Sequence, residues 1–303
     1  MSSEPRQHHL VTKAYLRRFA DRRGGITVVS RDRPSVRRVV SVDAAATFRD
    51  YYTLKGDRWE DPYGVERGLG EIEAAGLDAL RELCDEEQPL TEQRRDAVCL
   101  LAGYQYARGQ RPRRAAEALA QVLDQVTGGR AIAPDGTILD HPPVEAQDPN
   151  ERLASMISVG REVVAHLVKL RLKIVRFDRP SLLTADEPVH CLRYPGGSPL
   201  LGVGPASADE IWFPVDPQTL VVFSPHDTAG SWLTEGRHAA AAAMVNAAVA
   251  TGSYLEIYMT PGRDDMAGFE LPPPAALIEV GKPHDFDVDG VNAPPVRKHP
   301  RRR

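Results

Sequence analysis

The stretch VERGLGEIEAAGLDAL, residues 65–80, has the hydrophobic period of an amphipathic helix. At about 100° per residue, its apolar side chains share one broad arc that contains Val65, Leu69, Ile72, Leu77 and Leu80. Glu66 and Glu73 fall inside the same arc, about two helical turns apart and therefore nearly stacked. Because a charge is costly to bury without a partner, this helix predicts a polar feature within an apolar interface.

The next expected helix, TEQRRDAVCLLAGYQYAR over residues 91–108, repeats the pattern with positive charge. Thr91 supplies the side chain of an N-cap, and Arg94, Gln105 and Arg108 fall inside the apolar arc of the helix. Two interpretations remain open. The carboxylates of the first helix and the guanidiniums of the second form a buried ion-pair network, or the same groups line a polar cavity.

Strand-like runs lie on both sides of these helices. GITVVSR and VRRVVSV, joined by DRPS, predict a β-hairpin between about residues 25 and 42. After a long helix expected at about 151–170, the runs LKIVRF, SLLT, EIWFPV, TLVVFS and YLEIYM predict a mixed, mainly antiparallel β region. An Ala-rich helix is expected at about 237–251. A hairpin and a helical bundle followed by a β region indicate an α+β fold.

Composition divides the chain into four parts. Residues 1–129 contain the hairpin and the helical region, and residues 130–150, rich in Pro, Asp and Gly, form a connector. Residues 151–262 contain a helix and the β region, which we expect to pack on the first part as one compact unit. Residues 270–303 form a mostly irregular tail, which we expect to be dispensable for folding from about residue 283.

The 303-residue chain has the composition of a soluble globular protein, with 42% hydrophobic and 26% charged residues. Its net charge of −4 gives no overall affinity for nucleic acid. Residues 1–40 nevertheless carry ten Lys and Arg against three Asp and Glu, a balance of +7 that leaves nucleic acid open as a partner. Three scattered cysteines and no signal-peptide pattern predict a cytoplasmic protein, and no apolar run is long enough to predict a membrane span.

Several motifs resemble those of the domain-of-unknown-function family 4238. HLVTKAYLRRFA, residues 9–20, is similar to the family opening H-[YH]-x-P-x-x-Y-L-x-x-F, with His9 in the place of the family histidine. FRDYYTL followed by VERGLGEIEAAGLDAL resembles the family block fY…E…l…iE, which places Glu66 and Glu73 on its glutamates. Together with the motifs described next, the resemblance spans about residues 9–258.

The later motifs are LLTADEPV, which resembles the family signature [FI]-x-T-S-D-N-P, and IWFPVDPQTLVVFSP, which resembles the strand pair after it. The chain departs from the family at three positions. Thr12 replaces the usual proline, and Ala185 and Glu187 replace the usual Ser and Asn on either side of Asp186. The resemblance implies a fold and the location of a site, but no activity.

A polar cavity joining His9, Glu66, Glu73, Arg108 and Asp186 is our functional hypothesis. The motifs of phosphate-loop NTPases, α/β-hydrolases and common zinc enzymes are absent from the sequence. Glu66, Glu73 and Asp186 are candidate ligands of a divalent cation such as Mg²⁺ or Mn²⁺, with His9 and Arg108 as catalytic groups. This set suits a metal-dependent hydrolase acting on a phosphoester. The alternative is a non-catalytic module that binds an anionic ligand or a partner, with a purely structural Glu–Arg network.

Overall fold

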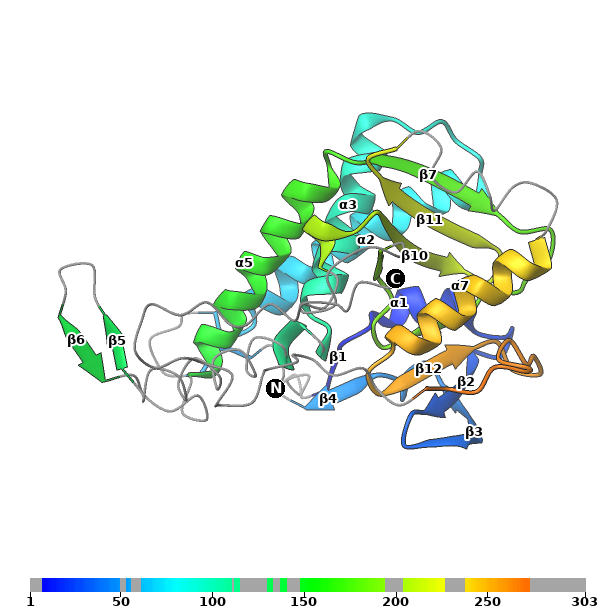
Figure 1. The fold of residues 1–303 in the computed structure, drawn as a ribbon, viewed down its shortest axis with the longest axis horizontal. Coiled ribbons are helices and arrows are strands. Elements are labelled where there is room, and N and C mark those ends of the chain that lie inside the picture. Colours follow the sequence, from blue (N-terminus) through cyan, green and yellow to red (C-terminus); the bar gives the residue numbers. More distant parts are fainter. Residues whose placement is uncertain are drawn as a thin grey trace, which may run out of the picture.

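The computed structural model confirms the predicted α+β class, with helices and two four-stranded antiparallel sheets (Figure 1). It describes residues 7–49, 53–55, 61–110, 112–114, 130–132, 137–140, 148–193, 204–226 and 238–272. The sequence also predicts a helix at about 113–127, and most of it lies outside these residues, as does the tail from about residue 283. Among the described helices, none has the length and apolar character needed to cross a membrane.

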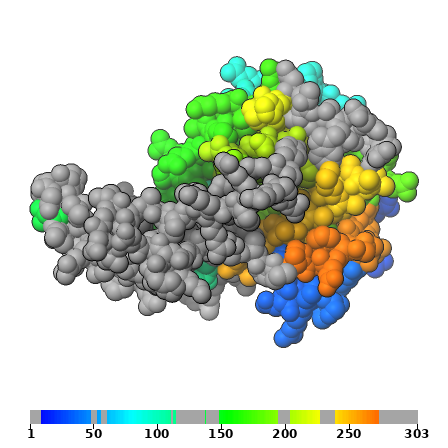
Figure 2. All heavy atoms as spheres, viewed as in Figure 1, coloured from blue at the N-terminus to red at the C-terminus, as the bar shows by residue number. Residues whose placement is uncertain are grey.

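The first sheet joins segments from both ends of the chain. β2 (Gly25–Ser30) and β3 (Arg33–Ser41) form the predicted hairpin, which protrudes from the body of the molecule (Figures 1 and 2). β12 (Glu256–Met259) pairs with β2, and the short β8 (Thr184–Ala185) pairs with β12. The order is therefore β3-β2-β12-β8, and the N-terminal hairpin shares a sheet with the last described strand.

The second sheet has the order β7-β11-β10-β9. Its two central strands, β10 (Glu210–Asp216) and β11 (Thr219–Ser224), were predicted from their apolar runs, and they form the strand pair that the family resemblance implies. β7 (Arg171–Arg176) flanks β11, and β9 (His190–Leu192), which the sequence did not predict, flanks β10.

Alternate residues of β10 face opposite sides of this sheet. Ile211 and Phe213 lie in the core shared with α1 (Lys13–Leu16), α2 (Gly64–Leu80) and α3 (Glu92–Ala107). Trp212 lies in the core shared with α7 (His238–Gly252). Figure 1 shows that α7 lies across the strands of this sheet. Because both faces are covered, the central strands are apolar throughout instead of alternating.

Three helices pack side by side against the second sheet: α2 (Gly64–Leu80), α3 (Glu92–Ala107) and α5 (Pro149–Leu167). The predicted N-cap is confirmed, since the Thr91 hydroxyl accepts a hydrogen bond from the Arg94 amide at 3.3 Å. The predicted contact between the first two helices is also confirmed.

The N-terminal segment places the start of the chain against these helices. β1 (Gln7–His9) pairs with β4 (Thr47–Arg49), and α1 (Lys13–Leu16) continues into the 3₁₀ turn η1 (Arg17–Phe19). Tyr15 fixes this turn in the core. Its buried ring stacks on Phe213 at 5.4 Å between centroids, and its hydroxyl lies 2.6 Å from the Thr184 hydroxyl.

The expected connector contains a small antiparallel hairpin, β5 (Arg130–Ile132) and β6 (Ile138–Asp140). Two further short elements complete the described chain. A five-residue π-helix, η2 (Arg81–Asp85), extends α2, and a 3₁₀ turn, η4 (Pro205–Ser207), precedes β10.

Candidate functional site

A cavity of about 310 Å³ lies where β1 and α1 meet α2 and α3. It is lined by His9, Thr12, Lys13, Ala14, Arg17, Glu66, Leu69, Gly70, Glu73 and Arg108. The structure therefore brings four of the five predicted site residues together, although they come from three separate parts of the chain. Asp186 is the predicted residue that does not line this cavity.

Arg108 and Glu73 form an ion pair inside the cavity. Arg108 follows the last residue of α3, and its side chain is only 3% exposed. Its Nη1 lies 2.5 Å from Oε1 of Glu73, whose side chain is 21% exposed. A short, charge-assisted contact between largely buried groups fixes the end of α3 against the middle of α2.

Arg94 has a different partner from the one its helix position predicted. Its Nε lies 2.5 Å from Oε2 of Glu82, and Nη1 donates to the Pro89 carbonyl at 2.9 Å. Extended to residue 82, the 100° periodicity of the helix at 65–80 predicts that Glu82 faces solvent, away from the apolar arc. The π-helix η2 begins one residue earlier, and its wider turns rotate the side chains away from the phase of a regular α-helix.

His9 contributes the imidazole of the cavity. Its ring is hydrogen-bonded to the Asp43 backbone carbonyl, and its buried Nε2 has no hydrogen-bond partner among the described residues. Burial lowers the pKa of His9 below its usual value, and the Lys13 charge acts in the same direction, whereas Glu73 opposes it. The neutral ring therefore donates through Nδ1 and keeps a lone pair on Nε2.

This lowered pKa predicts a pH-dependent stability. The folded state binds the His9 proton more weakly than the unfolded chain, so the stabilising effect of neutral His9 is complete above the unfolded pKa of about 6.5. It is lost as the pH falls through the folded pKa. In urea titrations between about pH 5 and 7, His9→Gln should show a shallower loss of stability on acidification than wild type. Identical slopes for the two proteins would contradict the burial of a neutral imidazole.

Two cations line the cavity on the side of α1. Lys13 forms an ion pair with Asp43, and Arg17 Nη2 lies 3.8 Å from the same carboxylate. The hydrogen bond from Lys13 lowers the pKa of Asp43, which is exposed. With Arg108, three cationic side chains and two carboxylates line the cavity, a charge balance that favours an anionic ligand.

Asp186 has a structural role instead. Its carboxylate accepts hydrogen bonds from the backbone amides of Tyr254 at 2.9 Å and Leu255 at 2.6 Å, which joins the end of β8 to the start of β12. Burial raises the pKa of Asp186 to about 6, against the effect of these hydrogen bonds. The three predicted metal ligands therefore do not converge. Nowhere in the described residues do three or more His, Cys, Asp or Glu side chains form a group that could hold a metal ion.

Comparison with known proteins covers this whole region. The family described as "Protein of unknown function (DUF4238)" matches residues 7–262, which include every residue that lines the cavity. The chain belongs to this family. No curated protein and no solved structure matches it. The family resemblance of the N-terminal, helical and strand motifs is thereby confirmed.

One polar residue near the site was missed by the sequence analysis. Glu187, in the place of the usual family Asn, is buried, and its carboxylate packs against Gly109, the residue after Arg108. A Cβ at position 109 would collide with this carboxylate. The departure from the family pattern at position 187 was the only sequence signal for this contact.

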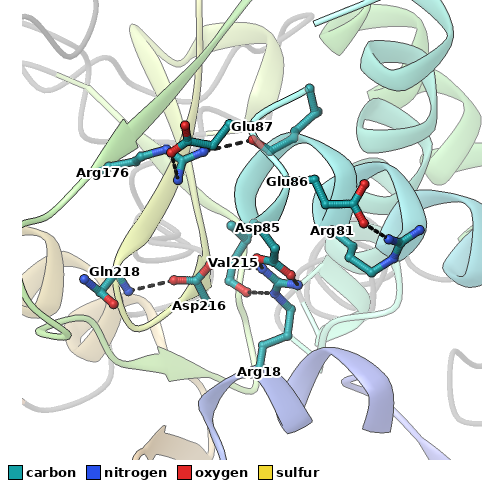
Figure 3. A network of polar contacts seen from close by, with 10 residues as sticks. Arg18, Arg81, Asp85, Glu86, Glu87, Arg176, Val215, Asp216 and Gln218 are labelled. Carbon is teal, nitrogen blue, oxygen red and sulfur yellow. Dashed lines mark hydrogen bonds and ion pairs between the residues drawn. The ribbon is translucent and has the colours of Figure 1, made fainter. Parts of the chain in front are cut away.

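A second polar cavity, of about 490 Å³, lies beside η1 and η2, and Figure 3 shows the polar contacts of this region. Arg18 lines this cavity, and its guanidinium donates to Asp85 at 2.8 and 3.1 Å and to Asp216 at 3.1 Å. Its Nε also donates to the Val215 carbonyl at 3.0 Å. Burial raises the pKa of Cys84, which also lines this cavity, to about 11, so the thiol stays protonated and unreactive at neutral pH. The ion pairs of Arg18 join η1, η2 and β10, so their role is structural.

Proposed function

We propose that the cavity around His9 and Arg108 binds a small ligand carrying a phosphate group and that the protein hydrolyses its ester bond. The observation that carries this proposal is the unpartnered Nε2 of a neutral, half-buried His9 in the same cavity as a buried arginine. A volume of about 310 Å³ suits a small molecule and not a polymer.

The cations supply the binding energy for the phosphate. Arg108 presents a planar set of donors that matches phosphate oxygens, and Lys13 and Arg17 extend the positive charge along α1. The Arg108 side chain is almost fully buried, so its charge is poorly screened by water and acts strongly on a bound anion.

His9 supplies the base. Nε2 accepts a proton from a water molecule as the water oxygen attacks phosphorus, and the ester P–O bond breaks. The imidazolium then returns the proton to the leaving oxygen, so the ring is regenerated in its neutral form. Arg108 stabilises the charge on the phosphoryl oxygens in the transition state.

A divalent cation, either Mg²⁺ or Mn²⁺, remains part of the proposal in a narrower form. Glu66 and Glu73 are its candidate protein ligands, and Mg²⁺ is commonly held by one or two carboxylates together with substrate phosphates. Because Glu73 is bonded to Arg108, the cation has to compete with a guanidinium. We therefore expect it to bind together with phosphate and only weakly by itself.

The alternative function is a non-catalytic module that binds an anionic ligand. The closed contact between Glu73 and Arg108 favours it, because a buried Glu–Arg network that fixes α2 on α3 needs no chemistry. For either function we infer a cytoplasmic location, which the free thiols of Cys84, Cys99 and Cys191 support.

The test combines thermal melting with a hydrolysis assay. Wild type should gain thermal stability from inorganic phosphate, and more from phosphate with Mg²⁺ or Mn²⁺, by mass action on the folded state. p-Nitrophenyl phosphate serves as the hydrolysis probe, and His9→Gln should lower its turnover by about 10²–10⁴-fold. Glu71→Gln, an exposed change on α2 beside the cavity-lining Glu73, is the control and should alter neither readout.

The outcomes separate the two functions. Stabilisation by phosphate without hydrolysis in wild type would support the binding module and overturn the enzyme. If Mg²⁺ or Mn²⁺ still adds thermal stability in Glu73→Gln, Glu73 is not a ligand of the metal. The absence of stabilisation by phosphate, with or without metal, would overturn both.

A further inference from the structure

β3 is an edge strand with an unusual surface. It runs over nine residues, Arg33–Ser41, and pairs with β2 on one side, whereas no strand of the described chain pairs with its outer edge. All of its residues except Val40 are exposed. Such an edge presents a row of backbone donors and acceptors that can pair with another extended chain.

The regular part of this strand begins at Arg37, because the pairing with β2 shifts its register between Arg37 and Arg33. Arg38 lies opposite Val28 and Arg37 opposite Val29, and these two valines belong to different cores on the two sides of the sheet. By the alternation of a strand, Val39 shares a face with Arg37, whereas Val36 lies in the irregular part just before the ladder.

Both valines are exposed large hydrophobic residues, Val36 at 47% and Val39 at 65%. β3 carries the charge and the proline, Pro34, that protect edge strands, but the two valines add apolar surface that protection does not require. Arg37 and Arg38 are held in position by surface contacts, with Asp264 at 2.7 Å and Glu256 at 3.3 Å. Exposed pairs of this kind contribute little stability, and arginine has enough donors to bind a second carboxylate.

The positive charge of β3 determines which kind of chain can pair with its outer edge. In an antiparallel pair of two copies of β3 centred near Arg37, the arginines of both chains would lie close together, and like charges opposite each other are unfavourable. An acidic chain has the complementary charge. Nucleic acid would meet the arginines but would leave the backbone groups and the two valines of the edge unused.

We propose that the outer edge of β3 binds an extended acidic segment of a partner protein as an added strand, with two adjacent acidic residues opposite Arg37 and Arg38 and an apolar residue opposite Val39. The two acidic residues pair with Arg37 and Arg38 on opposite faces, and the apolar residue covers Val39. A segment with an apolar residue on each side of the acidic pair fits the edge in either strand direction. The surface is separate from the lining of the cavity, and the proposal does not rest on the proposed hydrolysis.

The test uses the full chain and labelled synthetic peptides. A peptide with the core Val-Glu-Glu-Val should bind in fluorescence anisotropy, and a peptide with Val-Lys-Lys-Val should not. Arg37→Gln/Arg38→Gln should weaken binding at least about tenfold. Arg67→Gln, which removes an exposed, carboxylate-paired arginine from α2, is the control and should leave it unchanged. Hydrogen exchange should show new protection of backbone amides in β3 when the acidic peptide is bound.

Four results would overturn the proposal. The first is equal binding of a scrambled peptide with the same charge, and the second is binding without protection in β3. The third is displacement of the acidic peptide by single-stranded DNA at equimolar concentration, which would assign the edge to nucleic acid. The fourth is a concentration-dependent dimer in sedimentation that Val39→Thr abolishes, which would assign it to a second copy.

Discussion

Replacing Glu73 by alanine is expected to lower the free energy of unfolding by about 3–5 kcal/mol, because the buried Arg108 guanidinium then loses the carboxylate that compensates its charge. The Arg108 side chain is 3% exposed and cannot regain its hydration without moving the end of α3. Urea denaturation monitored by circular dichroism gives the measurement. The control Glu71→Ala, on the exposed face of α2, should cost less than about 0.5 kcal/mol.

A loss similar to that of the control would show that water reaches Arg108 in solution. Removing both partners separates stability from function. In Glu73→Leu/Arg108→Met the buried charges are gone, and such replacements are often neutral for stability. If this double variant is stable but is not stabilised by phosphate, the ion pair is retained for ligand binding and contributes little to folding.

The sequence predicts most of the local structure for simple reasons. Period-3.6 patterns defined α2 and α3, with the capping Thr91 marking the start of α3, and apolar runs bounded by turn residues defined β10, β11 and the β2–β3 hairpin. The pairings between strands distant in the sequence were not predictable. β12 pairs with β2, and β1 pairs with β4, through contacts that depend on the fold as a whole and leave no periodic signal in either segment.

The candidate site was predictable to the extent that it lies on regular helices. Glu66, Glu73 and Arg108 were found because each is a charge in an apolar arc, and they do line one cavity. Glu82 was assigned to the solvent face because its phase was extrapolated through a π-helix. Asp186 was misplaced because a loop has no period, so the sequence could not show that its carboxylate binds the amides before β12.

The position of Arg108 also depends on how closely α3 approaches α5. The two helices meet through glycines, Gly103 on α3 and Gly160 on α5. A Cβ at Gly103 would lie 2.5 Å from Val164 Cγ2 and 3.2 Å from the Val164 backbone nitrogen. A Cβ at Gly160 would lie 2.7 Å from the Tyr104 ring. The backbones are therefore in contact, and a side chain at either glycine has to separate the helices.

Gly103→Ala is accordingly expected to destabilise the protein by about 2 kcal/mol, because overpacking outweighs the gain of about 1 kcal/mol in helix propensity. Gly68→Ala is the matched control. Gly68 lies in α2 with nothing within 4 Å of its Cβ position, so the same substitution should stabilise by about 0.5–1 kcal/mol. Opposite signs in urea titrations of the two variants are the expected result. If Gly103→Ala stabilises as Gly68→Ala does, the α3–α5 contact is looser than the structure shows, and Arg108 is not held rigidly at the cavity.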